Sequence, residues 1–186
     1  RKAIYIMFLI EDKNFLTDKQ KDHIDNVVLE SNFPWFFHKV SVLPSKLSKS
    51  KDNKSYLSHI VLRRPDQRPN YEKFNSTESD FCIDVLKTFC EKHNIKCKEI
   101  LRISYNLTYN NGYSKGDLHI DHEYPHNQLI VYLNDCDKKL YTIIKDGKKE
   151  IKIKPEKFKG LCFESKPHYQ LFPKKQERVI LVITFR

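Results

Sequence analysis

The chain has 186 residues, 39% of them apolar and 12% aromatic, which is enough for one buried core and excludes a disordered chain. It has only 4 glycines and no glycine-rich string of the P-loop or dinucleotide-binding type, which argues against those nucleotide-binding folds. The net charge of +10 would suit an anionic partner, but the lysines are dispersed along the chain, which favours a solvated surface over a single binding stripe.

The cysteines favour a reducing compartment such as the cytoplasm. Their number is odd and no C-x-x-C pair occurs, so the sequence predicts neither a disulfide framework nor a cysteine zinc site. The five residues are Cys82, Cys90, Cys97, Cys136 and Cys162.

The opening residues resemble a signal peptide only in being apolar. Glu11 and Asp12 follow directly and no small-residue cleavage site is present, so we expect an opening strand. No apolar run reaches the length of a membrane span, so a soluble protein without membrane contact is expected.

A helix is predicted over residues 18–30. Thr17 and Gln20 form a capping-box pattern, in which a hydroxyl at the N-cap is followed three residues later by an amide. Ile24, Val27 and Val28 then recur at helical spacing. After an extended Phe-Pro-Trp segment, the Ser- and Lys-rich residues 46–54 are expected to form a loop.

A strand is predicted over Tyr56–Leu62, followed by a loop over residues 63–70 that contains two prolines. A second helix is predicted to begin near Thr77 and to end before Asn94. One face of it carries Phe81, Val85 and Phe89 together with Cys82, Leu86 and Cys90. We therefore interpret its two cysteines as core residues.

From residue 100 the apolar pattern has a period of two, which is typical of strands. Ile103, Tyr105, Leu107 and Tyr109 alternate with polar residues, and further short apolar runs occupy residues 129–133, 140–144, 151–153, 160–163 and 179–185. Asp146-Gly147 lies between two of these runs and predicts a hairpin. We predict one α+β domain over residues 1–186, with a helical supporting part (1–99) and a β-sandwich or jelly-roll core (100–186).

The residues most suggestive of chemistry are His119 and Asp121. On a strand, positions i and i+2 point to the same face, so the imidazole and the carboxylate would converge. The H-x-D pattern is common by chance, but three later residues strengthen it. Tyr132 lies on the next apolar run, His168 follows at a distance that suits a facing strand, and Arg178 directly precedes the last apolar run. Two histidines and one carboxylate leave positions on an iron open for substrate and O₂. An arginine fork suits a carboxylate, which indicates a keto-acid cosubstrate.

The other histidines are expected to bind no metal. His122 has the opposite parity to Asp121, and an H-x-x-x-H spacing with His126 does not form a ligand pair on a strand. The N-terminal histidines are interpreted as surface or structural residues; they are His23, His38, His59 and His93. The side chain of Arg186, the last residue, is expected to be exposed to solvent, and contact with the substrate is the alternative.

Seven strings between residues 109 and 178 resemble, in order and spacing, the 2-oxoglutarate- and Fe(II)-dependent dioxygenases, in particular the prolyl-4-hydroxylase-like branch. They are Tyr109-Asn110-Asn111-Gly112, His119-Ile120-Asp121, Tyr132-Leu133-Asn134, Ile153-Lys154-Pro155, Leu161-Cys162-Phe163, His168 and Arg178. In length and helical N-terminal layout the chain looks like the small members encoded by bacteriophages. One departure is Lys138-Lys139, where the family usually has a Gly-Gly pair.

The resemblance implies a double-stranded β-helix (a cupin-like jelly roll) with Fe(II) held by His119, Asp121 and His168. It further implies a group of residues that surround 2-oxoglutarate. Arg178 and Tyr132 would hydrogen-bond the distal carboxylate, and Tyr109 would line the pocket. Tyr105 and Ile130 are expected to be walls of the pocket, because Tyr105 lies on the same strand face as Tyr109 and Ile130 on the same strand face as Tyr132.

The implied activity is hydroxylation of a protein or peptide side chain, with release of succinate and CO₂. The alternative substrate is a nucleic acid base or nucleotide, which the net charge and the basic loops 46–54 and 63–68 would suit. A third interpretation is a non-catalytic basic binding module. The expected location is the cytoplasm, or a host's cytoplasm if the chain is phage-encoded.

Overall fold

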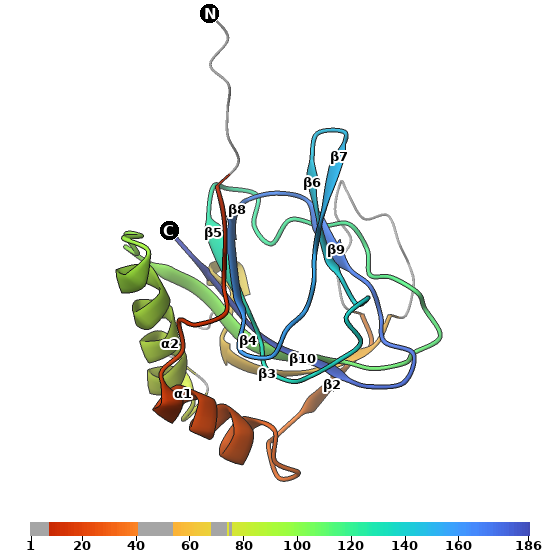
Figure 1. The fold of residues 1–186 in the computed structure, drawn as a ribbon, viewed down its shortest axis with the longest axis horizontal. Helices are drawn as coiled ribbons and strands as arrows, with labels where there is room; N and C mark the ends of the chain where they lie inside the picture. The colour runs from red at the N-terminus through yellow and green to blue at the C-terminus, as the bar shows by residue number, and fades with distance from the viewer. Residues whose placement is uncertain (1–7, 41–53, 68–73, 75) are drawn as a thin grey trace, which may run out of the picture.

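The structure is a computed structural model that describes residues 8–40, 54–67, 74 and 76–186 (Figure 1). Two helices are present in the described part, and the first continues into a π-helical segment. Their bounds are α1 (Asp18–His23) with its continuation η1 (Ile24–Val28), and α2 (Ser79–Lys92), with a single 3₁₀ turn at η2 (Pro65–Gln67).

Ten strands form the rest of the regular structure in the described ranges. They are β1 (Leu9–Asp12), β2 (Phe36–His38), β3 (Tyr56–Leu62), β4 (Ile100–Thr108), β5 (Asn127–Tyr132), β6 (Thr142–Asp146), β7 (Lys149–Ile153), β8 (Gly160–Glu164), β9 (His168–Gln170) and β10 (Arg178–Phe185).

The strands form two antiparallel sheets that face each other. The major sheet has the order β1-β8-β5-β10-β4-β3-β2 and the minor sheet the order β7-β6-β9. Residues 115–119 extend the minor sheet beyond β9 through the bridges Lys115–Leu171 and His119–His168. The helices lie on one side of the major sheet and the minor sheet lies on the other (Figure 1). This arrangement confirms the predicted α+β jelly roll.

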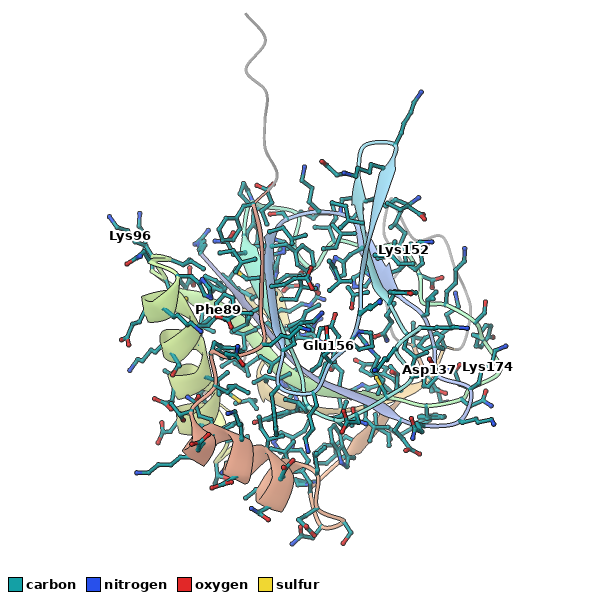
Figure 2. The ribbon with its side chains drawn as sticks, in the orientation of Figure 1. Phe89, Lys96, Asp137, Lys152, Glu156 and Lys174 are labelled. Atoms are coloured by element: carbon teal, nitrogen blue, oxygen red, sulfur yellow. The ribbon has the colours of Figure 1, made fainter. Side chains whose placement is uncertain are left out.

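The helical side of the major sheet holds the larger apolar core. Phe89 points from α2 toward the sheet (Figure 2) and meets Phe15 edge to face, with ring centroids 5.0 Å apart. Ile103 and Tyr105 of β4 belong to the same buried cluster. Cys82 and Cys90 are buried in it as well, which confirms their interpretation as core residues.

The close packing of α2 on the major sheet predicts a large cost for Gly160→Ala. An added Cβ would lie 2.8 Å from Phe15 Cε1 and 2.9 Å from Phe89 Cε2, so both rings would have to move. We expect a loss of about 1–3 kcal/mol in the free energy of unfolding, measured by chemical denaturation. Gly116→Ala is the control, since its nearest contact would be 3.6 Å and its expected change is below about 0.5 kcal/mol. Equal losses in the two variants would contradict this account.

Most predicted elements are confirmed within a few residues. The capping box of Thr17 and Gln20 is present, with Gln20 N donating to Thr17 Oγ1 over 3.2 Å. The Asp146-Gly147 hairpin joins β6 and β7, and Gly147 adopts the positive φ of 61° that the turn requires. The short strands β2 and β9 were not predicted, and β6 begins two residues later than expected. The predicted loop 46–54 and the first seven residues lie almost wholly outside the described ranges.

Residues 1–99 contribute strands as well as supporting helices. β3 pairs with β4, β2 pairs with β3, and β1 pairs with β8, so both edges of the major sheet come from this part of the chain. Among the helices described, none is both long and apolar enough to cross a membrane.

Candidate active site

Two histidines from distant parts of the chain are paired directly through their backbones. His119 N donates to His168 O over 3.1 Å, and His168 N donates to His119 O over 2.9 Å. The pairing holds their rings side by side, with centroids 4.4 Å apart. The two segments that carry them therefore fix the separation of the imidazoles.

Each imidazole is oriented by a hydrogen bond to a main-chain carbonyl. Nδ1 of His119 lies 2.9 Å from Asp117 O, and Nδ1 of His168 lies 3.0 Å from Lys166 O. A carbonyl oxygen only accepts, so both Nδ1 atoms donate, which leaves the Nε2 lone pairs available. Metal-binding histidines are typically held in this way.

Asp121 completes the group with one carboxylate oxygen. Its Oδ2 lies 3.8 Å from His168 Nε2, whereas Oδ1 receives Arg64 Nη2 at 3.1 Å and Arg102 Nη1 at 3.3 Å. Arg64 Nη1 also donates to the Asp121 carbonyl. The two guanidinium groups occupy Oδ1, so Oδ2 is the oxygen available to a metal.

The charges around the group favour its metal-binding protonation state. Burial opposes ionisation of Asp121, but its electrostatic interactions, first with His168 and then with Arg102, lower its pKa below the usual value. Burial, followed by repulsion from His119, lowers the pKa of His168 to about 4. At neutral pH the site therefore offers a carboxylate and a neutral imidazole, as metal binding requires.

The three side chains fit a metal ion. The ligand atoms of His119, Asp121 and His168 all lie within 4.8 Å of one another, and among the described residues no other such group of three occurs. Two imidazoles and one carboxylate on one side of an ion are the ligand set of non-haem Fe(II) sites with open positions. The structure thus brings together the three residues that the sequence suggested.

A cavity of about 900 Å³ runs between the two sheets past this group. The inner faces of the three central strands of the major sheet line one side of it. Their residues are Arg102, Asn106 and Thr108 of β4, Gln128 and Ile130 of β5, and Arg178, Ile180 and Val182 of β10. His38, Tyr56 and Tyr124 line it farther along.

Arg178 is a buried cation in this cavity that pairs with no carboxylate of the described residues. It is 1% exposed, its Nη2 donates to Thr142 Oγ1 over 2.8 Å, and its Nη1 donates to Gln170 Oε1. Its Nε is buried without a hydrogen-bond partner in the part of the chain that the structure describes. A buried charge needs a counter-charge, so the position fits a carboxylate ligand.

Tyr132 lies beside this arginine. Its hydroxyl is 2.7 Å from Thr142 Oγ1, and the Arg178 Cζ lies 5.4 Å from the centroid of its ring. Desolvation raises the pKa of Tyr132, so the hydroxyl stays protonated and can donate to Thr142, whereas Tyr132 itself is not among the cavity-lining residues. Tyr132, Thr142 and Arg178 therefore converge on one place.

Tyr105 does not line the cavity, so its prediction as a wall was wrong. Its hydroxyl donates to Glu78 Oε2 over 3.1 Å and lies 3.2 Å from Cys82 Sγ, both on the helical side of the sheet. Tyr109 is likewise not among the cavity-lining residues, and its hydroxyl is 2.8 Å from Ser55 Oγ. The alternation in β4 was identified correctly but assigned to the wrong faces, because its apolar side packs on the helices and its polar side faces the cavity. Ile130 does line the cavity.

The remaining histidines make other contacts. His122 Nε2 is 2.8 Å from Thr184 Oγ1, and His126 Nδ1 is 2.9 Å from the Tyr124 carbonyl. The four N-terminal histidines also bond protein groups; these are His23 with Glu78, His38 with Ser58, His59 with Ser76, and His93 with Asp12. His38 additionally lines the cavity. Arg186 pairs with Glu99 at 2.8 Å.

Sequence reasoning missed the residues that support the predicted ones. They are Arg64, Arg102, Gln128, Thr142 and Gln170. The polar face of β4 was a usable signal for Arg102, since a buried strand with polar alternate residues indicates a lined cavity. Nothing in the local sequence marks Arg64, which reaches Asp121 from the loop after β3.

Comparison with known proteins extends this picture of the fold. A scan against protein-family models and a search of curated proteins each gave no match. An oxidoreductase of the 2OG-Fe(II) oxygenase family from Burkholderia pseudomallei is structurally similar, with a TM-score of 0.73 and 14% identity over 95% of this chain and 84% of that chain. A Trichoplax adhaerens prolyl hydroxylase, in complex with a peptide fragment of the hypoxia inducible factor oxygen degradation domain, has a TM-score of 0.59 and 14% identity over 95% and 82%.

A viral example is the collagen prolyl hydroxylase of Paramecium Bursaria Chlorella virus-1, in its 2OG complex. Its TM-score is 0.55 and its identity 15%, over 95% of this chain and 94% of that chain. At these identities the likenesses show a common fold. They agree with the jelly roll described above.

Proposed function

We propose that this chain is an Fe(II)- and 2-oxoglutarate-dependent oxygenase that hydroxylates a protein or peptide side chain. One observation carries the proposal: an arginine that pairs with no carboxylate in the described ranges is buried in the same cavity as a cluster of two histidines and one carboxylate. The cluster suits a ferrous ion, and the arginine suits the distal carboxylate of a keto acid.

Iron and 2-oxoglutarate would supply the chemistry, the transfer of one oxygen atom of O₂ to a C–H bond while the keto acid becomes succinate and CO₂. His119, Asp121 and His168 would hold the ion. Arg64 and Arg102 bind the second oxygen of Asp121 and so orient the carboxylate. These outer contacts matter because a misdirected ligand weakens metal binding by about 10–100-fold.

The residues at the Arg178 end of the cavity bind and orient the cosubstrate. Arg178 and Thr142 would donate hydrogen bonds to its distal carboxylate, and Tyr132 holds Thr142 in place through its hydroxyl. Ile130, Ile180 and Val182 line the cavity between this end and the histidines. Their apolar surfaces exclude water and so strengthen the charge interactions.

A peptide is the substrate class that the comparisons support. Two of the similar structures are prolyl hydroxylases, and one of them holds a peptide fragment. The outer cavity offers stacked aromatic surfaces that suit an apolar peptide side chain. The rings of His38 and Tyr56 lie 5.0 Å apart, and those of His122 and Tyr124 lie 5.1 Å apart.

The test is an anaerobic titration of the metal-free protein with Fe(II) and then 2-oxoglutarate, followed by calorimetry and absorbance. We expect saturable binding of both, and succinate after O₂ is admitted. Peptide and oligonucleotide libraries are then compared for a mass gain of one oxygen atom. Absence of 2-oxoglutarate binding to the metal-loaded protein would reject the proposal, and a gain on oligonucleotides alone would overturn the peptide assignment.

A further inference from the structure

A buried glutamine on β5 contacts the nitrogen atom of His168 that would bind the metal. Gln128 Nε2 lies 3.3 Å from His168 Nε2, and Gln128 is 1% exposed. Its strand neighbours are Thr184 on β10 and Phe163 on β8, both in register with it. Gln128 lines the cavity.

The cavity face of β5 is apolar beyond Gln128. The next inward residues along β5 are Ile130 and Tyr132, which belong to the buried cluster on the cavity side of the sheet. A glutamine in such a place loses its hydration on folding and needs internal partners. The polar partner that the structure shows for this amide is His168, within the cavity.

The direction of the hydrogen bond is fixed by chemistry. An amide nitrogen only donates, so His168 Nε2 must be the acceptor. This agrees with the tautomer set at the other side of the ring, where Nδ1 donates to Lys166 O. His168 Nε2 has one lone pair, and a metal ion would need the same lone pair.

Metal binding must therefore free the Gln128 amide while it stays buried. A buried donor without a partner is costly, and the new neighbours available to it are the oxygen atoms of whatever else the metal holds. We propose that Gln128 is a cosubstrate-binding residue, whose amide moves its hydrogen bond from His168 to an oxygen atom at the metal-bound end of the keto acid. The inference rests on the proposed function.

The contact would be a second anchor for the cosubstrate, at the opposite end from Arg178. Arg178 lies at the start of β10 and Gln128 is paired with Thr184 near its end. Arg178 thus recognises the distal carboxylate, and Gln128 recognises the end that chelates the metal. Together they select a dianion of defined length over a simple carboxylate.

The test compares Gln128→Met, which keeps the size of the side chain but removes its donor, with the wild type. Mn(II) replaces iron to prevent turnover, and binding is measured by calorimetry. We expect Mn(II) affinity to stay equal or to rise severalfold, because the competing hydrogen bond is gone. We expect 2-oxoglutarate affinity of the Mn(II)-loaded protein to fall about tenfold. Without metal, 2-oxoglutarate should bind both proteins equally.

Asn127→Leu is the matched control, because it removes an amide from the neighbouring position on the other face of β5. It should change neither affinity. Gln128→Leu repeats the test if the methionine variant folds poorly, as judged by circular dichroism. Unchanged 2-oxoglutarate affinity in a folded, Mn(II)-loaded Gln128 variant would overturn the inference, and so would a loss of Mn(II) affinity. Failure of the wild type to bind either ligand would instead overturn the proposed function.

Discussion

Replacing His168 by alanine is expected to lower the affinity for Fe(II) at least about 100-fold while leaving the fold intact. The substitution removes one of the three ligand atoms, and the two that remain bind an ion much more weakly. The backbone hydrogen bonds between His168 and His119 do not involve the side chain and persist in the variant. The lost imidazole borders the cavity, so water can replace it.

The measurements are Fe(II) or Mn(II) titration and thermal unfolding of the metal-free protein. His93→Ala is the control, since His93 Nε2 bonds Asp12 Oδ2 at 2.8 Å and His93 belongs to no cluster of metal-binding residues within the described part of the chain. It should retain full metal affinity. If His168→Ala binds iron as tightly as the wild type, the ligand assignment is wrong.

Arg178→Leu is expected to weaken 2-oxoglutarate binding about 100-fold or more without destabilising the ligand-free protein. Removing one partner of a buried ion pair ordinarily lowers the free energy of unfolding by about 3–5 kcal/mol, because the other charge stays buried without a partner. Arg178 pairs with no carboxylate among the described residues, and its polar contacts are the neutral groups of Thr142 and Gln170. Thr142 and Gln170 line the cavity, so water can replace the lost donors, and the change in the free energy of unfolding should stay below about 1 kcal/mol.

Calorimetry with 2-oxoglutarate and urea denaturation in its absence measure the two quantities. Arg178→Lys is the matched variant, because it keeps the charge but loses the planar fork, and should bind with intermediate affinity. A strong loss of stability in Arg178→Leu, with unchanged ligand affinity, would identify Arg178 as a structural residue and remove the main support for a keto-acid cosubstrate.

Much of the fold was readable because local patterns match single elements. The capping box marks the start of α1, and Asp146-Gly147 marks the hairpin. The three clustered ligand residues were also readable, since His119 and Asp121 are close in sequence and His168 follows at a distance that suits a facing strand. Short strands such as β2 and β9 carry too few residues for a period to be visible.

The parts that could not be read depend on which face of a strand meets which layer. β4 is buried on both faces, so alternation alone does not distinguish the helical side from the cavity, and Tyr105 was assigned to the wrong one. Arg64 and Gln128 reach the site through tertiary contacts with residues far away in the chain. Such contacts leave no periodic trace in the sequence.

The backbone pairing of His119 with His168 has a consequence for how the protein matures. The pairing joins segments distant in the chain, and such long-range contacts form late because closing long loops is entropically unfavourable. A nascent chain or a partly folded intermediate without this contact presents at most two of the three ligand groups together. Under the proposed function, iron captured at that stage would be lost again, so metal uptake should follow completion of the fold and report on it.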